Sequence, residues 1–212
     1  MRCINITNGK YLNDYLQNKY NEIFIPFNEA MIQGDLLYPL FDEKFINYRS
    51  TLHNVSYDYY LDNLNDFISI RNYINDIDKI VLWFGEDAFC IINLLTVLTY
   101  LEELNYNNKI ILNIVDDITC NVLISNIKID LHCYKEVYIN LINRTLIKTD
   151  NDIIYDGLKD YLYITSNNNH IIDYIKNNKD LSKEKLLINI MDNTYKYGLS
   201  DVFIMSLINK YI

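Results

Sequence analysis

The chain contains few of the residues that build linkers or small cross-linked domains. Five glycines and two prolines occur among 212 residues, so no Gly/Ser/Pro-rich linker divides the chain. The four cysteines include no Cys-x-x-Cys pair, which leaves no basis for a zinc knuckle or a disulfide framework. The first residues lack the apolar core of a secretory signal, and Asn93 and Thr96 interrupt the longest apolar stretch. We therefore expect a cytoplasmic protein without a membrane-spanning segment.

Positive charge is also scarce. The chain has 19 Lys and Arg residues against 28 Asp and Glu residues, which gives a net charge of −9 and a pI of about 4.7. This balance opposes binding to a nucleic-acid backbone, and the sequence contains no lysine cluster to offset it. The sequence also lacks the histidine spacing of zinc sites, the Gly-x-Ser-x-Gly elbow and the Gly-rich phosphate loops. It therefore supports neither nucleic-acid binding nor any of these three site types.

Apolar, strand-like segments alternate with helical stretches in the first half of the chain. Hydrophobic residues make up 50% of the sequence, which is enough for a large core. The strand-like segments are Cys3–Thr7, Glu22–Pro26, Ile80–Phe84 and Lys109–Val115. Such alternation predicts a Rossmann-like α/β fold, with a mostly parallel sheet and helices on both faces. We assign residues 1–118 to this sheet domain and residues 119–212 to a mainly helical C-terminal region packed on it.

Five motifs spread along the chain carry a resemblance to a known family. They are Ile6-Thr7-Asn8-Gly9, Pro26-Phe27-Asn28-Glu29-Ala30-Met31, Phe41 to Arg49 followed by His53-x-Val-Ser, Leu82-Trp83-Phe84-Gly85-Glu86-Asp87 with Phe89-Cys90, and Gly198-Leu199-Ser200. On these motifs the chain resembles the bacterial proteins grouped as domain of unknown function 1835. Many of those proteins carry Asp where this chain has Lys10 and Cys90, so no role is carried over to these two positions. The resemblance implies the α/β fold and the choice of site residues, and it implies no activity.

Polar and acidic side chains follow each of the four predicted strands. In an open parallel sheet, ligands bind outside the carboxyl ends of the strands, where the loops converge. The loops carry Thr7, Asn8 and Gly9, then Asn28 and Glu29, then Gly85, Glu86 and Asp87, and finally Asp116 and Asp117. We expect one acidic concavity, in which Glu29, Glu86 and Asp87 hold Mg²⁺ or act as general acid and base. A small polar or phosphate-bearing ligand would then contact Thr7, Asn8, Gly9, Asn28 and Arg49.

Each group also has a purely structural explanation, and two other functions stay open. Glu86 and Asp87 stand where carboxylates cap a helix, and a helical Arg49 would ordinarily form a surface ion pair. The helix at 88–104 has almost no polar face, so either this chain or a second copy in a homodimer must cover it. The helical C-terminal part would suit a regulatory or scaffold protein that binds a partner. A helix-turn-helix made by residues 181–191 and 200–211 would bind nucleic acid, but Asp192 and Asp201 flank its turn.

Overall fold

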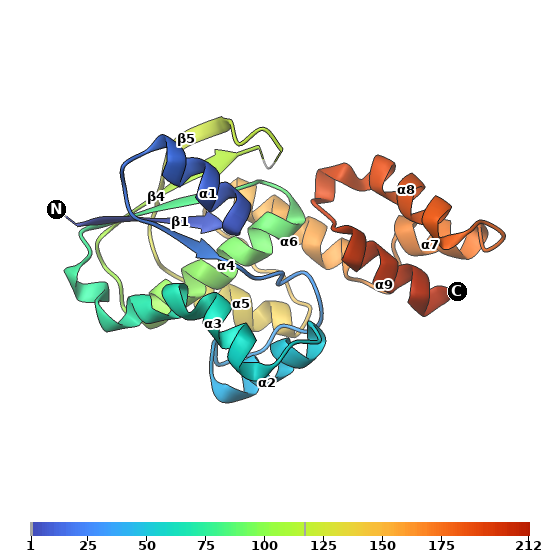
Figure 1. Cartoon of the computed structure of the whole chain (residues 1–212), viewed down its shortest axis with the longest axis horizontal. Helices are drawn as coiled ribbons and strands as arrows, with labels where there is room; N and C mark the ends of the chain where they lie inside the picture. Colours follow the sequence, from blue (N-terminus) through green and yellow to red (C-terminus); the bar gives the residue numbers. More distant parts are fainter. Residues whose placement is uncertain (1, 117) are drawn as a thin grey trace.

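A computed structural model describes residues 2–116 and 118–212 of the chain. Its centre is a five-stranded sheet of order β2-β1-β3-β4-β5 (Figure 1). The strands are β1 (Cys3–Asn8), β2 (Phe24–Phe27), β3 (Lys79–Phe84), β4 (Lys109–Val115) and β5 (Val122–Ile129). The first four are parallel, and β5 pairs with β4 in the antiparallel sense. The predicted Rossmann-like α/β fold with a mostly parallel sheet is therefore confirmed.

Helices cover the two faces of the sheet unequally. The register places Ile4, Ile80 and Ile110 in one row, and their side chains join the large hydrophobic core. The alternate side chains point to the opposite face, where Trp83 packs in a small separate cluster with Leu16. Only α1 (Lys10–Lys19) contributes to that small cluster among the described helices. On the large-core side lie α2 (Glu43–Leu52), α3 (Tyr57–Ile68), α4 (Ala88–Glu103), α5 (Tyr134–Ile142) and α6 (Asp152–Ile164).

The apolar helix α4 is covered by its own chain. Every residue from Cys90 to Leu101 is buried, because α4 packs against the sheet, α5 and α6. Gly157 in α6 lies so close that an added Cβ would approach Ile91 to 2.5 Å. The apolar surface of α4 is therefore buried by helices of the same chain. A homodimer contact, the alternative cover for α4, would meet no exposed residue between Cys90 and Leu101.

The last three helices form a group beside the sheet. They are α7 (His170–Asn177), α8 (Lys183–Thr194) and α9 (Asp201–Tyr211), and α6 leads to them (Figure 1). The boundary predicted at residue 118 falls in the connection between β4 and β5, so the sheet continues beyond it. The helices set apart from the sheet begin only after α6. No helix in the described part of the chain has the length and apolarity needed to cross a membrane.

One predicted helix is shorter than its pattern suggested. The spacing of Leu61, Leu64 and Ile68 predicts one helix over residues 57–77, but α3 ends at Ile68 and short 3-10 turns follow at Ser69–Asn72 and Ile74–Asp76. The hydroxyl of Tyr100 in α4 donates to the carbonyl oxygen of Ile68 at 3.0 Å. A tertiary contact from α4 therefore lies at the residue where α3 ends.

Candidate functional site

The carboxyl edge of the sheet contains the point at which the chain reverses its direction of winding. From β1 the chain passes to β2 on one side, and from β3 it passes to β4 on the other. Such a switch point opens a crevice between the loops of the two central strands. Two cavities lie at this edge, one of about 290 Å³ beside the loops after β1 and β2 and one of about 420 Å³ beside the loops after β3 and β4. We call them the β2 cavity and the β4 cavity.

Glu29, directly after β2, lies on the β2 cavity with a buried carboxylate. Its Oε1 accepts hydrogen bonds from Arg49 Nη2 (2.5 Å), His53 Nε2 (2.9 Å) and the backbone N–H of Ala30 (2.7 Å). Its Oε2 accepts from the hydroxyl of Tyr60. Burial raises the pKa of Glu29, but the bond from His53 and the charge of Arg49 outweigh it, so the pKa lies below its usual 4.5. The carboxylate is therefore held in its ionised form by donors from two helices and a loop.

Arg49 is completely buried, contrary to the expected surface ion pair. It lies on the same face of α2 as Phe45 and Ile46, four and three residues earlier, which carries it into the core. Its Nη1 donates to the carbonyl oxygen of Gln33 (2.5 Å), and its Nη2 also donates to that of Ala30 (2.9 Å). Arg49 is not among the residues that line the β2 cavity, so it positions Glu29 and does not reach a ligand there.

Asn93 joins α4 to the loops after β1 and β2. This fully buried amide donates to Asn8 Oδ1 (2.8 Å) and to the carbonyl oxygen of Glu29 (2.7 Å). It accepts a hydrogen bond from the backbone N–H of Met31 (2.9 Å). Asn8 in turn donates to the sulfur of Cys90 at 2.9 Å. Asn8 is thus held by α4, and its amide supports the loops that border the β2 cavity.

The remaining residues predicted after β1 and β2 divide between the interior and the cavity. Thr7 is buried, and its hydroxyl lies within hydrogen-bond distance of the Gly9 carbonyl oxygen (3.3 Å) and of Asn13 Oδ1 (3.1 Å). Gly9 and Asn28 both line the β2 cavity. Gly9 has a φ of 85° and open space where a Cβ would stand, so the turn before α1 is unobstructed. The structure brings Gly9, Asn28 and Glu29 together at the β2 cavity, whereas Thr7 is buried and does not line it.

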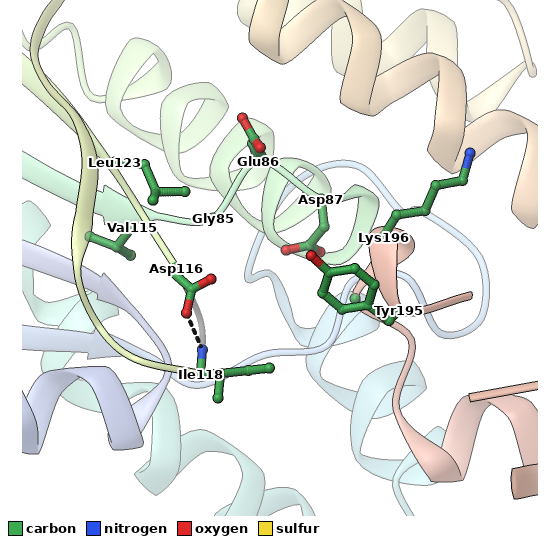
Figure 2. Close-up of a pocket in the computed structure, with 10 residues that line it drawn as sticks. Gly85, Glu86, Asp87, Val115, Asp116, Ile118, Leu123, Tyr195 and Lys196 are labelled. Atoms are coloured by element: carbon green, nitrogen blue, oxygen red, sulfur yellow. Dashed lines mark hydrogen bonds between the residues drawn. The ribbon is translucent and has the colours of Figure 1, made fainter. Parts of the chain in front are cut away.

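Glu86 and Asp87 line the β4 cavity, together with Asp116, Tyr195 and Lys196 (Figure 2). Asp87 is the N-cap of α4, and its Oδ1 accepts from the backbone N–H of Cys90 at 3.0 Å. In Figure 2 the side chain of Glu86 points away from that of Asp87, and the amine of Lys196 points away from both. The pKa of Asp116 is lowered by hydrogen bonds from Thr119, first from its backbone N–H. The predicted Asp117 lies outside the described residues.

The three acids expected to hold Mg²⁺ do not share one cavity. Glu29 follows β2 whereas Glu86 and Asp87 follow β3, and β1 separates these strands in the sheet. Two strand spacings separate the backbones by roughly 10 Å. The buried carboxylate of Glu29 is also already engaged by Arg49 and His53 through Oε1 and by Tyr60 through Oε2. No group of three His, Cys, Asp or Glu side chains in residues 2–116 and 118–212 is placed to hold a metal. The expected single acidic concavity is therefore replaced by two cavities with different chemistry.

The sequence reasoning missed three residues of this site, namely His53, Tyr60 and Asn93. His53 follows Arg49 by four residues, which places both on one side of α2, and this spacing was a usable signal. Asn93 is an amide within an otherwise apolar helix, which indicates a buried polar contact. Tyr60 gave no comparable signal among the 20 tyrosines of the chain.

Comparisons of the chain with family models, with curated proteins and with solved structures found no match. The resemblance to domain of unknown function 1835 accordingly stays a prediction.

Proposed function

We propose that the protein binds, or acts on, a small polar ligand in the β2 cavity, and that phosphate-bearing molecules are the first class to test. The observation that carries the proposal is His53. Its side chain is 24% exposed and lines the cavity, while Nε2 is fixed on the buried carboxylate of Glu29. Buried polar networks that open onto a cavity concentrate at functional sites, because burial and specific charge partners tune the groups for chemistry.

The lining of the β2 cavity supports a polar or anionic ligand. Asn28 and Asn63 offer amides, Tyr59 offers a hydroxyl, and all three line the cavity. Glu29 repels an anionic ligand only weakly, because the guanidinium of Arg49 lies 2.5 Å from its carboxylate and compensates the charge. The first turn of α1 begins directly after Gly9 and has no side-chain cap, so its backbone N–H groups add donors near the cavity.

A thermal-shift panel tests this function. Inorganic phosphate, nucleoside monophosphates, sugar phosphates and dicarboxylates are added to the wild-type chain, each with and without MgCl₂, because a bound phosphate supplies oxygen ligands to magnesium. A ligand present at 100 times its Kd stabilises the folded state by about 2.7 kcal/mol. For a chain of this size that is a rise in Tm of roughly 5–11 °C.

Two histidine variants locate the response. His53→Gln removes the ring from the cavity, and His132→Gln removes a histidine that pairs with Asp150 on the surface. We expect the ligand-induced rise in Tm to be lost in His53→Gln and retained in His132→Gln. An equal response in both variants would place the ligand elsewhere, and no response to any compound in the wild type would end the proposal for these classes.

The helical C-terminal part favours a second candidate function, the binding of a protein partner. Ile188, Met191 and Tyr195 lie three and four residues apart and are 59%, 42% and 76% exposed. Exposed apolar side chains at this spacing form a stripe along α8 and the turn after it. Sedimentation equilibrium of the wild type and of Ile188→Ser/Met191→Ser tests whether the stripe joins two copies. A monomer at all concentrations would exclude self-association, and a dimer unaffected by the substitutions would exclude the stripe.

A further inference from the structure

The ring of His53 is held in one orientation by two contacts. Nε2 lies 2.9 Å from Glu29 Oε1, and the ring stacks on Tyr60 with centroids 6.0 Å apart and an angle of 13° between the planes. With Nε2 turned toward Glu29, Nδ1 has no hydrogen-bonding partner within residues 2–116 and 118–212. The fixed orientation therefore leaves one ring nitrogen available to a ligand.

The neighbours of Nε2 determine which nitrogen of the neutral ring carries the hydrogen. A carboxylate oxygen only accepts hydrogen bonds. An unprotonated Nε2 at 2.9 Å from Glu29 Oε1 would therefore place the nitrogen lone pair against an oxygen lone pair, and the two would repel each other. Arg49 Nη2 is 3.2 Å from Nε2, but its hydrogens are already directed to Glu29 and to the carbonyl oxygen of Ala30. The arrangement thus favours hydrogen on Nε2 and a lone pair on Nδ1.

We infer that His53 exchanges a proton with the bound ligand through Nδ1, and that Glu29 is the positioning residue for this transfer. In the forward direction an O–H bond of the ligand breaks, its electron pair stays on the ligand oxygen, and a new N–H bond forms at Nδ1. The ring then carries a positive charge, which Glu29 stabilises at Oε1. This inference rests on the proposed function, because the ligand must occupy the β2 cavity to reach Nδ1.

The charged and titratable groups around the ring come from three elements. Glu29 follows β2, Arg49 belongs to α2, and Tyr60 and Tyr59 belong to α3. Arg49 opposes a second positive charge beside it, and Glu29 favours one. His132 differs, because both of its nitrogens lie near protein acceptors, Nε2 near Asp150 (2.7 Å) and Nδ1 near the carbonyl oxygen of Asp130 (3.1 Å). His132 is therefore a matched control without a free nitrogen.

Nuclear magnetic resonance of the ligand-free protein tests the geometry on its own. The chain has three histidines, so ¹⁵N labelling of histidine and the variants His132→Gln and His170→Gln assign the ring signals. We expect the neutral ring of His53 to carry its hydrogen on Nε2. In Glu29→Gln the new amide can donate to Nε2, so the share of the Nε2–H form should fall. A neutral ring with hydrogen mainly on Nδ1 in the wild type would overturn the inference whether or not a ligand binds.

The pH dependence of phosphate binding tests the proton transfer. Inorganic phosphate is titrated into the wild type, His53→Gln and His132→Gln between about pH 5.5 and 8.5, the interval that spans histidine titration. Phosphate titrates equally in all three experiments, so the difference in slope reports the proton carried by His53. One linked proton changes the wild-type Kd by up to about tenfold per pH unit relative to His53→Gln. His132→Gln should follow the wild type.

The outcomes separate the two proposals. Equal slopes for the wild type and His53→Gln would overturn proton exchange while the ligand site stands. An absence of phosphate binding in all three proteins would overturn both phosphate as the ligand and proton exchange with it. A steeper pH dependence of phosphate binding in the wild type and His132→Gln than in His53→Gln, with Nε2–H in the free protein, would support both.

Discussion

The buried ion pair between Arg49 and Glu29 makes a strong prediction about stability. Both side chains are wholly buried, and their closest atoms are 2.5 Å apart. Replacement of Arg49 by Met keeps most of the side-chain volume but removes the compensating charge. Loss of one partner of a buried pair costs about 3–5 kcal/mol, because the other charge stays buried and unpaired. The carbonyl oxygens of Gln33 and Ala30 also lose their donor. For a chain of this length, the Tm should fall by roughly 6–20 °C.

Urea denaturation followed by circular dichroism measures this loss. The control is Arg144→Met, because Arg144 donates to the Thr165 hydroxyl and the Leu162 carbonyl oxygen but is exposed to solvent. Its loss should stay within about 1 kcal/mol. In the double variant Arg49→Met/Glu29→Gln no buried charge is left unpaired, so its loss should be smaller than the sum of the two single losses. A cost of less than about 1 kcal/mol for Arg49→Met, or strict additivity, would refute the reasoning.

Three further predictions concern acid stability and two contacts near the sheet edge. The pKa of Glu29 is lower in the folded state, so its ionised carboxylate stabilises the fold above pH 4.5, and this stabilisation is lost as the pH falls through the folded-state pKa. Between about pH 5 and 3 the wild type should therefore lose more free energy of unfolding than Glu29→Gln. Urea titrations at each pH measure the difference. Gly198→Ala should lower the free energy of unfolding by about 2 kcal/mol or more in the same assay, because φ is 66° and the new Cβ would lie 2.0 Å from Asp87 Oδ1. The control Gly9→Ala meets no neighbouring atom, so it should cost only the backbone strain of about 1 kcal/mol. Asp87→Asn should change the Tm little, because asparagine caps a helix as well as aspartate, whereas Asp87→Ala removes the cap and should cost about 1 kcal/mol. A large loss in Asp87→Asn would indicate that the charge of Asp87 has another role.

The strands and the mostly parallel sheet could be predicted from the sequence, because they depend on local patterns and on the alternation of strands with helices. A run such as Ile80–Phe84 is long enough only for a buried strand, and Gly85 with Asp87 provides a turn and a helix cap. The assigned boundary at residue 118 does not follow the sheet, which also includes β5. β5 has mostly exposed side chains, and its place in the sheet depends on backbone pairing with β4, which leaves little trace in hydropathy.

The candidate site was predictable in its location and only partly in its members. Glu29, Asn28 and Gly9 follow strand ends, so the rule for parallel sheets places them at one edge. The rule does not say which neighbouring loops share a cavity, because strand order is fixed by long-range pairing. This is why Glu29 was expected beside Asp87, although β1 lies between their strands. The role of Arg49 was misread because helix position alone does not distinguish a surface arginine from a buried one.

The residues of the buried Arg49–Glu29 network indicate that its main role is to orient its neighbours and not to stabilise the fold. Arg49 Nε has no hydrogen-bonding partner among the described residues, so the guanidinium retains part of its desolvation penalty. Apolar residues of similar volume often replace buried ion pairs at no loss of stability. This ion pair is not optimised for stability, and it holds a carboxylate in contact with the histidine that lines the β2 cavity. The orientation that it imposes on His53 explains it best. On this argument, variants that stabilise the fold by replacing both Arg49 and Glu29 with apolar residues should still lose any ligand response that depends on His53.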